Sequence, residues 1–191
     1  MSQIMRFHKH PNNYNWSIMP NSISYSNRNS AGANQISKLM LDASSSVNMD
    51  FGCSGSSAET EDSASALRNR FGYSSANYTS ASYDVIESEM SKSKPVILRG
   101  GRRQDWVIFS VYTGGHAWIC DGIKKYKMKI RISPGASPIH PGGIANIHLA
   151  TVWSFHMNWG WGGYLDGWYS NWENKEGRFT YKTGMVYNIR K

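Results

Sequence analysis

The spacing of apolar residues changes once along this chain, near Pro95, and that change restricts the folds that are open to it. Before Pro95, apolar residues recur at every third or fourth position, which predicts amphipathic helices. After Pro95, apolar and polar residues alternate over short runs, which predicts strands. Helices followed by a mostly antiparallel sheet define an α+β fold. We therefore divide the chain into a helical half, residues 1–94, and an antiparallel β half, residues 95–191.

Several segments of the helical half have helical spacing, and a polar loop over 12–29 follows the first of them. Segment 1–10 ends before Pro11 and begins without a capping residue, so it predicts the end of a helix that starts upstream. Further helices are expected over 30–41, after a capping box of the form S-x-x-E at 56–59, and over 82–91. The apolar faces of these helices comprise Ile4, Met5, His8, Ile36, Leu39, Met40, Ala64, Leu67, Phe71, Tyr83, Ile86 and Met90.

The β half predicts strands at 95–98, 106–112, 116–121, 123–133, 150–159, 167–172 and 179–189, with a proline-rich loop over 133–143. The segment 123–133 alternates most regularly. Its basic residues are Lys125, Lys127, Lys129 and Arg131, and its apolar residues are Tyr126, Met128, Ile130 and Ile132. This pattern predicts a half-buried antiparallel strand with a basic outer face.

Charge and composition exclude several classes of protein. Aromatic residues make up 13% of the chain and charged residues only 18%, which excludes extended disorder. The longest apolar run, 106–112, is far too short for a membrane helix, and no signal peptide is visible. Two cysteines are too few for a disulfide framework. We find no motif for a metal or other cofactor.

The net charge of +8 permits attraction to nucleic acid, anionic lipid or acidic polymers. The charge is spread along the chain, so we expect no specific nucleic-acid partner. The basic residues of 124–131 have two readings, which remain open. They can protect a solvated edge strand, or they can form a binding site for a polyanion.

His116 is the most informative titratable residue, because two glycines precede it at the start of a predicted strand. Glycine at 115 keeps the imidazole reachable and lets another backbone approach. A second unusual segment, NWGWGG at 158–163, places tryptophans beside a flexible backbone. An Asn or Trp there could hold one tautomer of a histidine. The alternatives are a structural histidine and a packed aromatic corner of the sheet.

These two segments together resemble the streptopain-like cysteine peptidases (peptidase family C10), which are bacterial relatives of papain. The resemblance rests on GGHAWICDG at 114–122 and HMNWGWGG at 156–163. Shorter matches occur in the family's order at 3–11, 14–16, 46–52, 55–58 and 71–73. The resemblance implies a papain-like fold, in which a helical half and a twisted antiparallel sheet enclose a cleft. It also implies proteolysis, with polypeptide substrates and a propeptide or propeptide-like inhibitor as partners.

The resemblance assigns roles to individual residues. His116 is implied to be the general base and imidazolium partner of a cysteine thiolate. Trp159 is implied to orient that histidine, with Asn158 and Trp161 in supporting places. Gly115, Ser56, Ser57 and Trp161 are implied to contact the substrate. An imidazolium beside a thiol lowers the thiol pKa, so the chemistry is consistent with these roles.

One departure from the family pattern concerns the nucleophile. The family's cysteine lies in a motif like G-C-V-A-T-A, and the match to this chain begins only after that motif. Cys53 and Cys120 are poor substitutes, since one lies in a loop and the other shares a strand with His116. We therefore expect the sequence to be N-terminally truncated, with the nucleophile upstream of Met1. The alternative is a catalytically inactive module that binds peptides or an inhibitor. By analogy with the family, the protein is expected to be bacterial and secreted or bound to the cell envelope.

Overall fold

The structure, a computed structural model, describes residues 1–53, 55–106, 109–132 and 146–191, with backbone alone for 130–132 and 146–148. The helices are α1 (Ser2–His8), α2 (Ala31–Ser46), α3 (Asp62–Asn69) and α4 (Tyr83–Met90), with 3-10 turns at Trp16–Ile18 and Tyr25–Asn27. The strands are β1 (Asp50–Gly52), β2 (Gly55–Ser57), β3 (Ser75–Ser80), β4 (Val96–Asp105), β5 (Ser110–Ile132), β6 (Asn146–Asn158), β7 (Gly167–Tyr169), β8 (Glu173–Asn174), β9 (Gly177–Arg178) and β10 (Tyr181–Arg190).

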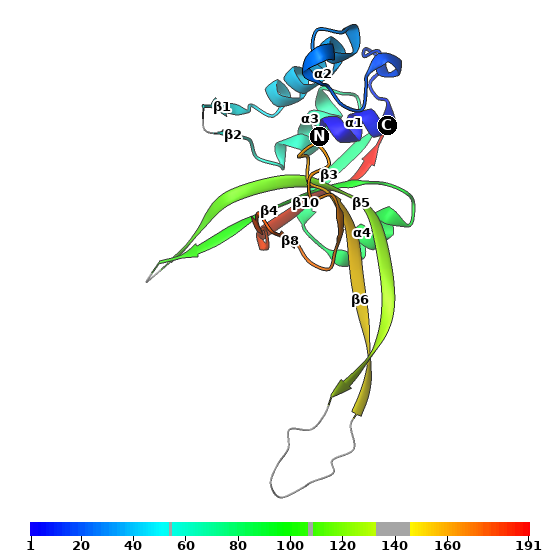
Figure 1. Ribbon diagram of the computed structural model, residues 1–191, viewed down its shortest axis with the longest axis vertical. Helices are drawn as coiled ribbons and strands as arrows, with labels where there is room; N and C mark the ends of the chain where they lie inside the picture. Colours follow the sequence, from blue (N-terminus) through cyan, green and yellow to red (C-terminus); the bar gives the residue numbers. More distant parts are fainter. Residues whose placement is uncertain (54, 107–108, 133–145) are drawn as a thin grey trace, which may run out of the picture.

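The main sheet is antiparallel and has the strand order β3-β10-β4-β5-β6-β7. Figure 1 shows α1, α2 and α3 together at one end of the sheet, with both chain termini beside them. This arrangement confirms the α+β class. β3 precedes Pro95 in the chain, yet it belongs to this sheet and forms one of its edges beside β10.

The core has one layer on each face of the sheet. Ile97, Ile119 and Val186 point toward α1–α3, where they join Ile4, Leu39 and Leu67 in one apolar cluster. Their chain neighbours Val96, Leu98, Trp118, Cys120 and Met185 point to the opposite face and pack with Ile86 of α4. Because both faces are covered here, the central strands have continuous apolar runs instead of alternation.

The ends of the helices follow from local sequence. Ser30 caps α2, because its hydroxyl accepts a hydrogen bond from the Ala33 N–H at 3.2 Å. Ser82 stands in the same position before α4 and accepts from Val85 N–H. The capping box expected at 56–59 is wrong. Ser56 and Ser57 belong to β2, and α3 begins only at Asp62. No helix among the described residues has the length and apolarity to cross a membrane.

β5 departs most from expectation. The segments 116–121 and 123–133, expected as separate strands, are parts of one strand that runs from Ser110 to Ile132. The strand expected at 106–112 is wrong in part, since Trp106 and Phe109 lie in the turn between β4 and β5. Residues 107–108, Ser133 and the expected loop over 133–143 lie outside the described residues.

The expected burial of one face of 123–133 is also wrong. Tyr126 is 49% exposed and Met128 is 50% exposed. These side chains are exposed because β5 pairs only with β6 beyond Ile123. Among the described residues, no other strand or helix covers the apolar face. The side chains of Ile130, Arg131 and Ile132 lie outside the described set.

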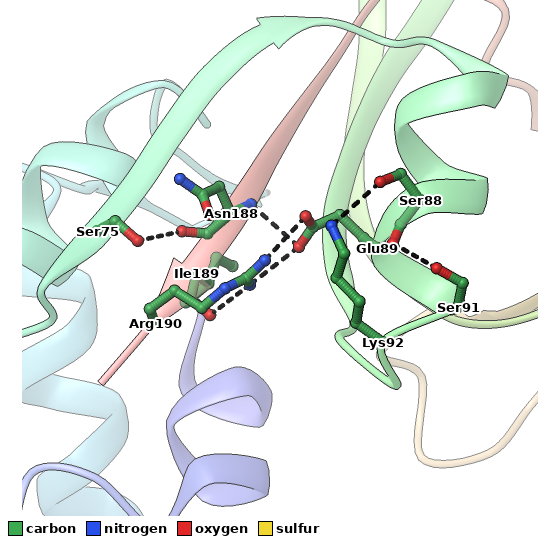
Figure 2. A network of polar contacts seen from close by, with 8 residues as sticks. All are labelled: Ser75, Ser88, Glu89, Ser91, Lys92, Asn188, Ile189 and Arg190. Atoms are coloured by element: carbon green, nitrogen blue, oxygen red, sulfur yellow. Dashed lines mark hydrogen bonds and ion pairs between the residues drawn. The ribbon is translucent and has the colours of Figure 1, made fainter.

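A buried ion pair fastens α4 to the end of β10 (Figure 2). The carboxylate of Glu89, which is 6% exposed, accepts from both terminal nitrogens of Arg190 at 3.0 Å. It also accepts from the backbone N–H of Asn188 at 3.2 Å, and the Asn188 carbonyl in turn accepts from the Ser75 hydroxyl at 2.6 Å. These contacts link α4, β10 and β3.

His8 on α1 is buried, and neither ring nitrogen has a hydrogen-bond partner among the described residues. Burial, with the positive charges of Lys94, Lys191, His10 and Arg190, lowers the pKa of His8 from 6.5 to about 4. The unfolded chain therefore binds a proton between pH 6.5 and 4 that the folded chain does not bind, so stability falls as the pH falls through that window.

We expect the free energy of unfolding to fall by roughly 2 to 3 kcal/mol between pH 7 and 4.5 because of His8, since one pKa unit corresponds to about 1.4 kcal/mol. Urea unfolding curves of the wild type and of His8→Leu, recorded at both pH values, isolate this part. The difference between the two proteins should shift in favour of His8→Leu as the pH is lowered. An equal pH dependence in both proteins would show that His8 does not titrate in this way.

Candidate active site

His116 lies half-buried on β5, opposite Gly100 of β4, and an aromatic cluster surrounds its ring. The closest ring is Trp161, whose centroid is 4.7 Å away at an interplanar angle of 27°. Phe179 lies at 5.5 Å, and Trp118 and Trp159 each lie at 6.2 Å. Rings on several sides restrict how the imidazole can rotate.

The hydrogen bond of His116 fixes which nitrogen carries the proton. Its Nε2 lies 2.8 Å from the main-chain carbonyl oxygen of Trp159. A carbonyl can only accept, so Nε2–H donates and the neutral ring has its unshared pair on Nδ1. Among the described residues no hydrogen bond to Nδ1 is present, so this nitrogen is available as a base.

Burial also sets the charge of His116. Removal from water lowers the pKa of His116 below its ordinary value of 6.5, and the Trp159 carbonyl partly offsets this effect by favouring the protonated ring. The imidazole is therefore neutral at pH 7 in this structure. A thiolate beside the ring would raise its pKa again.

The turn after β6 presents the Trp159 carbonyl. Gly160, Gly162 and Gly163 have φ values of 80°, 66° and 92°, which side chains strongly disfavour. The carboxylate of Asp166 accepts from the Trp159 N–H at 2.9 Å and closes the turn. Trp159 itself is fully buried in the aromatic cluster. The glycine-rich motif thus holds one carbonyl in place against the histidine.

Asn158 takes part in a different set of contacts. Its side-chain oxygen accepts from the Gln3 amide at 2.9 Å and from the Gly160 N–H at 3.0 Å. No hydrogen bond joins Asn158 to His116 in the described part of the chain. Asn158 connects the turn to α1 instead, so its contact with the histidine is indirect.

A cleft of about 720 Å³ lies beside His116. Gly115, Ser56 and Ser57 line it together with His116. Trp159 and Trp161, whose rings lie beside the histidine ring, and Asn158 are not among its described lining residues. The other lining residues include apolar residues of α2 and β1, such as Leu41 and Phe51, the charged residues Glu59 and Arg99, and Met1 and Ser2 at the start of α1.

Neither cysteine is placed as a partner for His116. Cys120 is buried on the same strand, and burial raises its thiol pKa to about 12, so it is a protonated core residue. Cys53 is exposed next to the β1–β2 turn, and it is not among the described residues that line the cleft. That neither thiol is the nucleophile remains a prediction.

Sequence reasoning missed three residues of the site. Trp118 and Phe179 flank the histidine ring, and Asp166 anchors the turn that carries the Trp159 carbonyl. The place of Trp118 could have been inferred from the sequence, because it lies two positions after His116 and so shares its face of β5. Nothing in the sequence places Asp166 or Phe179 at the site, since only the folded chain brings them near.

Comparison with known proteins decides the family. The sequence profile of the peptidase C10 family matches residues 12–169, which is most of the chain. The chain belongs to the peptidase C10 family. Streptopain of Streptococcus pyogenes is 29% identical over 166 residues, covering 82% of this C10 chain and 32% of streptopain. The thiol protease/hemagglutinin PrtT of Porphyromonas gingivalis is 31% identical over 162 residues, covering 81% of this chain and 14% of PrtT.

The fold of this C10 chain is that of a solved cysteine protease. Active wild-type interpain A of Prevotella intermedia superposes with a TM-score of 0.70 at 23% identity, covering 100% of this chain and 80% of interpain A. A prointerpain A fragment superposes with a TM-score of 0.66 at 22% identity, covering 100% and 61% of the two chains. The papain-like fold is therefore confirmed. The chain spans about one third of the length of streptopain.

Proposed function

We propose that this chain is the histidine-bearing part of a cysteine endopeptidase that cleaves polypeptides through an acyl-enzyme. The observation that carries the proposal is the setting of His116. Its ring borders an open cleft, and the Trp159 carbonyl holds the proton on Nε2. Nδ1 can then take a proton from a thiol and later return it to the leaving amine.

We propose that the nucleophilic thiol comes from a residue that precedes Met1. Met1 and Ser2 line the same cleft as His116, so a cysteine a few residues before them would open into that cleft. A thiol with an ordinary pKa of about 8.5 becomes a thiolate at neutral pH beside an imidazolium. Trp159 and Trp161 then act as positioning residues for His116, and Asn158 supports the turn.

The proposed substrate is an extended polypeptide. Gly115 presents backbone at the cleft, and Ser56 and Ser57 on β2 face it from the other side. A Cβ at Gly115 would approach the Tyr112 hydroxyl to 2.5 Å, so Tyr112 occupies the space that a side chain at this position would need. Extended backbone of this kind suits a peptide bound as an added strand.

Further parts of the proposal rest on analogy with relatives. The prointerpain A fragment superposes over this whole chain, which supports a propeptide or propeptide-like inhibitor as a partner. The relatives are bacterial, and we propose a bacterial protein that is secreted or held at the cell envelope. Neither a metal nor another cofactor is needed for the proposed reaction.

The competing proposal is a catalytically inactive, peptidase-like module that binds peptides or an inhibitor. The observation in its favour is that neither cysteine of the 191 residues is among the described residues of the cleft. The codons before Met1 separate the two proposals. An in-frame segment like G-C-V-A-T-A supports the enzyme, and a promoter with a ribosome site directly before Met1 supports the module.

Expression of the chain with and without its in-frame upstream segment tests the enzyme. We expect the 191 residues alone to leave casein intact, and the extended chain to cleave it in a thiol-dependent manner. The extended chain should also bind an epoxide thiol trap covalently, at its upstream cysteine. An extended chain that contains this cysteine and neither cleaves casein nor reacts with the trap would contradict the proposal.

A further inference from the structure

A two-stranded ribbon projects from the sheet, and the peptidase reaction does not use it (Figure 1). Residues 124–132 of β5 pair with residues 146–154 of β6. β4 stops pairing with β5 at Cys120, and β7 pairs with β6 only from Phe155. No third strand therefore flanks the ribbon in the described part of the chain. We call the described residues 124–129 and 149–154 the β5–β6 ribbon.

The β5–β6 ribbon is strongly basic. No Asp or Glu occurs in the sequence between Asp121 and Asp166. Lys125 forms an ion pair with Glu87 of α4 at 3.0 Å, whereas Lys127 and Lys129 have no carboxylate within ion-pair distance among the described residues. These two lysines share a face of β5 about 7 Å apart, so their charges add at the surface.

The ribbon also exposes large apolar side chains. Leu149 is 69% exposed, Met128 50% and Tyr126 49%. Leu149 is paired with Lys129 on one face, and Met128 is paired with Ala150 on the other. Apolar side chains therefore stand on both faces at the same level, far from the core. A lone two-stranded hairpin gains little stability in water, so a packed core does not account for these large apolar side chains.

We propose that the β5–β6 ribbon binds the surface of a membrane that contains anionic lipids. The face that carries Lys127, Lys129 and Leu149 lies on the membrane, with both lysines at the headgroups and Leu149 in the interfacial layer. The long lysine side chains can keep their ammonium groups in water while their stems lie along apolar surface. This binding is peripheral, and it is independent of the proposed peptidase reaction.

Other binding partners match either the lysines or the exposed apolar side chains of the ribbon, but not both. An anionic polymer, such as a sulfated glycan or a duplex nucleic acid, pairs with the lysines and leaves Leu149 on the same face in water. A second copy of the chain could cover the apolar side chains, but it would bring the lysines of the two copies together. A membrane with anionic headgroups over an apolar layer matches both chemistries at once.

Cosedimentation of the 191-residue chain with lipid vesicles tests the proposal. The chain should bind vesicles of about 30% phosphatidylserine in phosphatidylcholine at least tenfold more strongly than pure phosphatidylcholine. Salt should weaken the binding, because screening reduces the attraction between the lysines and the headgroups. The measurement requires no catalytic activity, so it is informative even if the peptidase proposal fails.

Paired variants locate the site. Lys127→Gln with Lys129→Gln should lower the vesicle partition coefficient about 25-fold, since each lysine near an anionic surface contributes about fivefold. The control, Lys92→Gln with Lys182→Gln, removes the same charge from exposed positions elsewhere and should change binding less than about twofold. Leu149→Ser keeps every charge and should lower binding about tenfold, whereas Met128→Ser on the opposite face should change binding less than about twofold. Matching far-UV circular dichroism and melting temperatures establish that the variants fold.

Several outcomes would overturn the proposal. These are equal binding to both vesicle types, no vesicle binding at all, or an equal loss of vesicle binding in the two lysine double variants. Tighter binding to heparin or duplex DNA, unaffected by Leu149→Ser, would assign the ribbon to a polymer. A dimer in sedimentation that Leu149→Ser or Met128→Ser dissociates, without an effect on vesicles, would assign the ribbon to a second copy.

Discussion

Replacement of His116 by alanine in the extended, cysteine-bearing chain is expected to lower kcat/KM for peptide hydrolysis by at least about 10³-fold, because nucleophile and base act as a unit. The substitution removes the Nδ1 that we propose as the base, and the Nε2–H whose hydrogen bond the Trp159 carbonyl accepts at 2.8 Å. His156 provides a matched control, since it is a partly exposed histidine on β6 paired with Asp121 at 2.6 Å. His156→Gln should retain activity within about twofold.

The same His116→Ala protein gives a second readout that loss of folding cannot imitate. Without an imidazolium partner, the pKa of the nucleophilic thiol should rise toward about 8.5. The rate of alkylation by iodoacetamide, measured from pH 5 to 9, reports this change directly. Retained hydrolysis in His116→Ala, or an unchanged alkylation profile, would remove His116 from the proposed catalytic pair.

Glu89→Ala is expected to lower the free energy of unfolding by about 3 kcal/mol, because loss of one partner leaves a poorly solvated charge. The carboxylate is 6% exposed and Arg190 only 27%, so water compensates little for the lost pair. The N–H of Asn188 loses an acceptor as well. Urea unfolding followed by tryptophan fluorescence measures the effect.

Glu87→Ala on the same helix is the control for Glu89→Ala. Glu87 pairs with Lys125 at 3.0 Å, but the two side chains are 38% and 48% exposed. A pair of this kind contributes about 0 to 1 kcal/mol. Equal losses in the two variants would show that burial does not distinguish these ion pairs. A double variant with Arg190→Ala should lose less than the sum of the single variants, since the two residues share one interaction.

The parts of the fold that depend on local sequence were predictable. Helical spacing placed the starts of α2 and α4 within one residue of their true positions, where the hydroxyls of Ser30 and Ser82 cap the helices, although α2 continues to Ser46, beyond its expected end. The motif at 56–59 has the same local form, yet Ser56 pairs with Phe51 in a hairpin. Contacts across the hairpin outweighed a capping preference that is worth about 1 kcal/mol.

Burial on the long strand was not predictable from alternation. The pattern of 123–133 gives two different faces, but it does not say whether another element covers either of them. Val96, Ile97 and Leu98 show the opposite case, since a continuous apolar run there marks a strand covered on both faces. The number of layers packed on a strand is a property of the whole fold.

The candidate site was predictable in its residue types and not in its contacts. His116 and Trp159, which come from the motifs at 114–122 and 156–163, lie together in the structure, and the roles that the resemblance implies for them remain predictions. The atom of Trp159 that contacts the ring is a main-chain carbonyl, which every residue carries and which no sequence motif specifies. Asn158 bonds Gln3 and Gly160 instead, and its role at the site remains a prediction. The division into halves at Pro95 likewise remains a prediction.

β5 is one continuous strand that carries His116 near its start and Lys127 toward its far end. No loop or hinge separates the two positions, so the span between them is at most about 35 Å. On the two proposals above, a membrane that holds the ribbon would therefore set the height of the cleft above its surface. The strand would then act as a spacer, and cleavage would be confined to those parts of a neighbouring polypeptide that extend to that height.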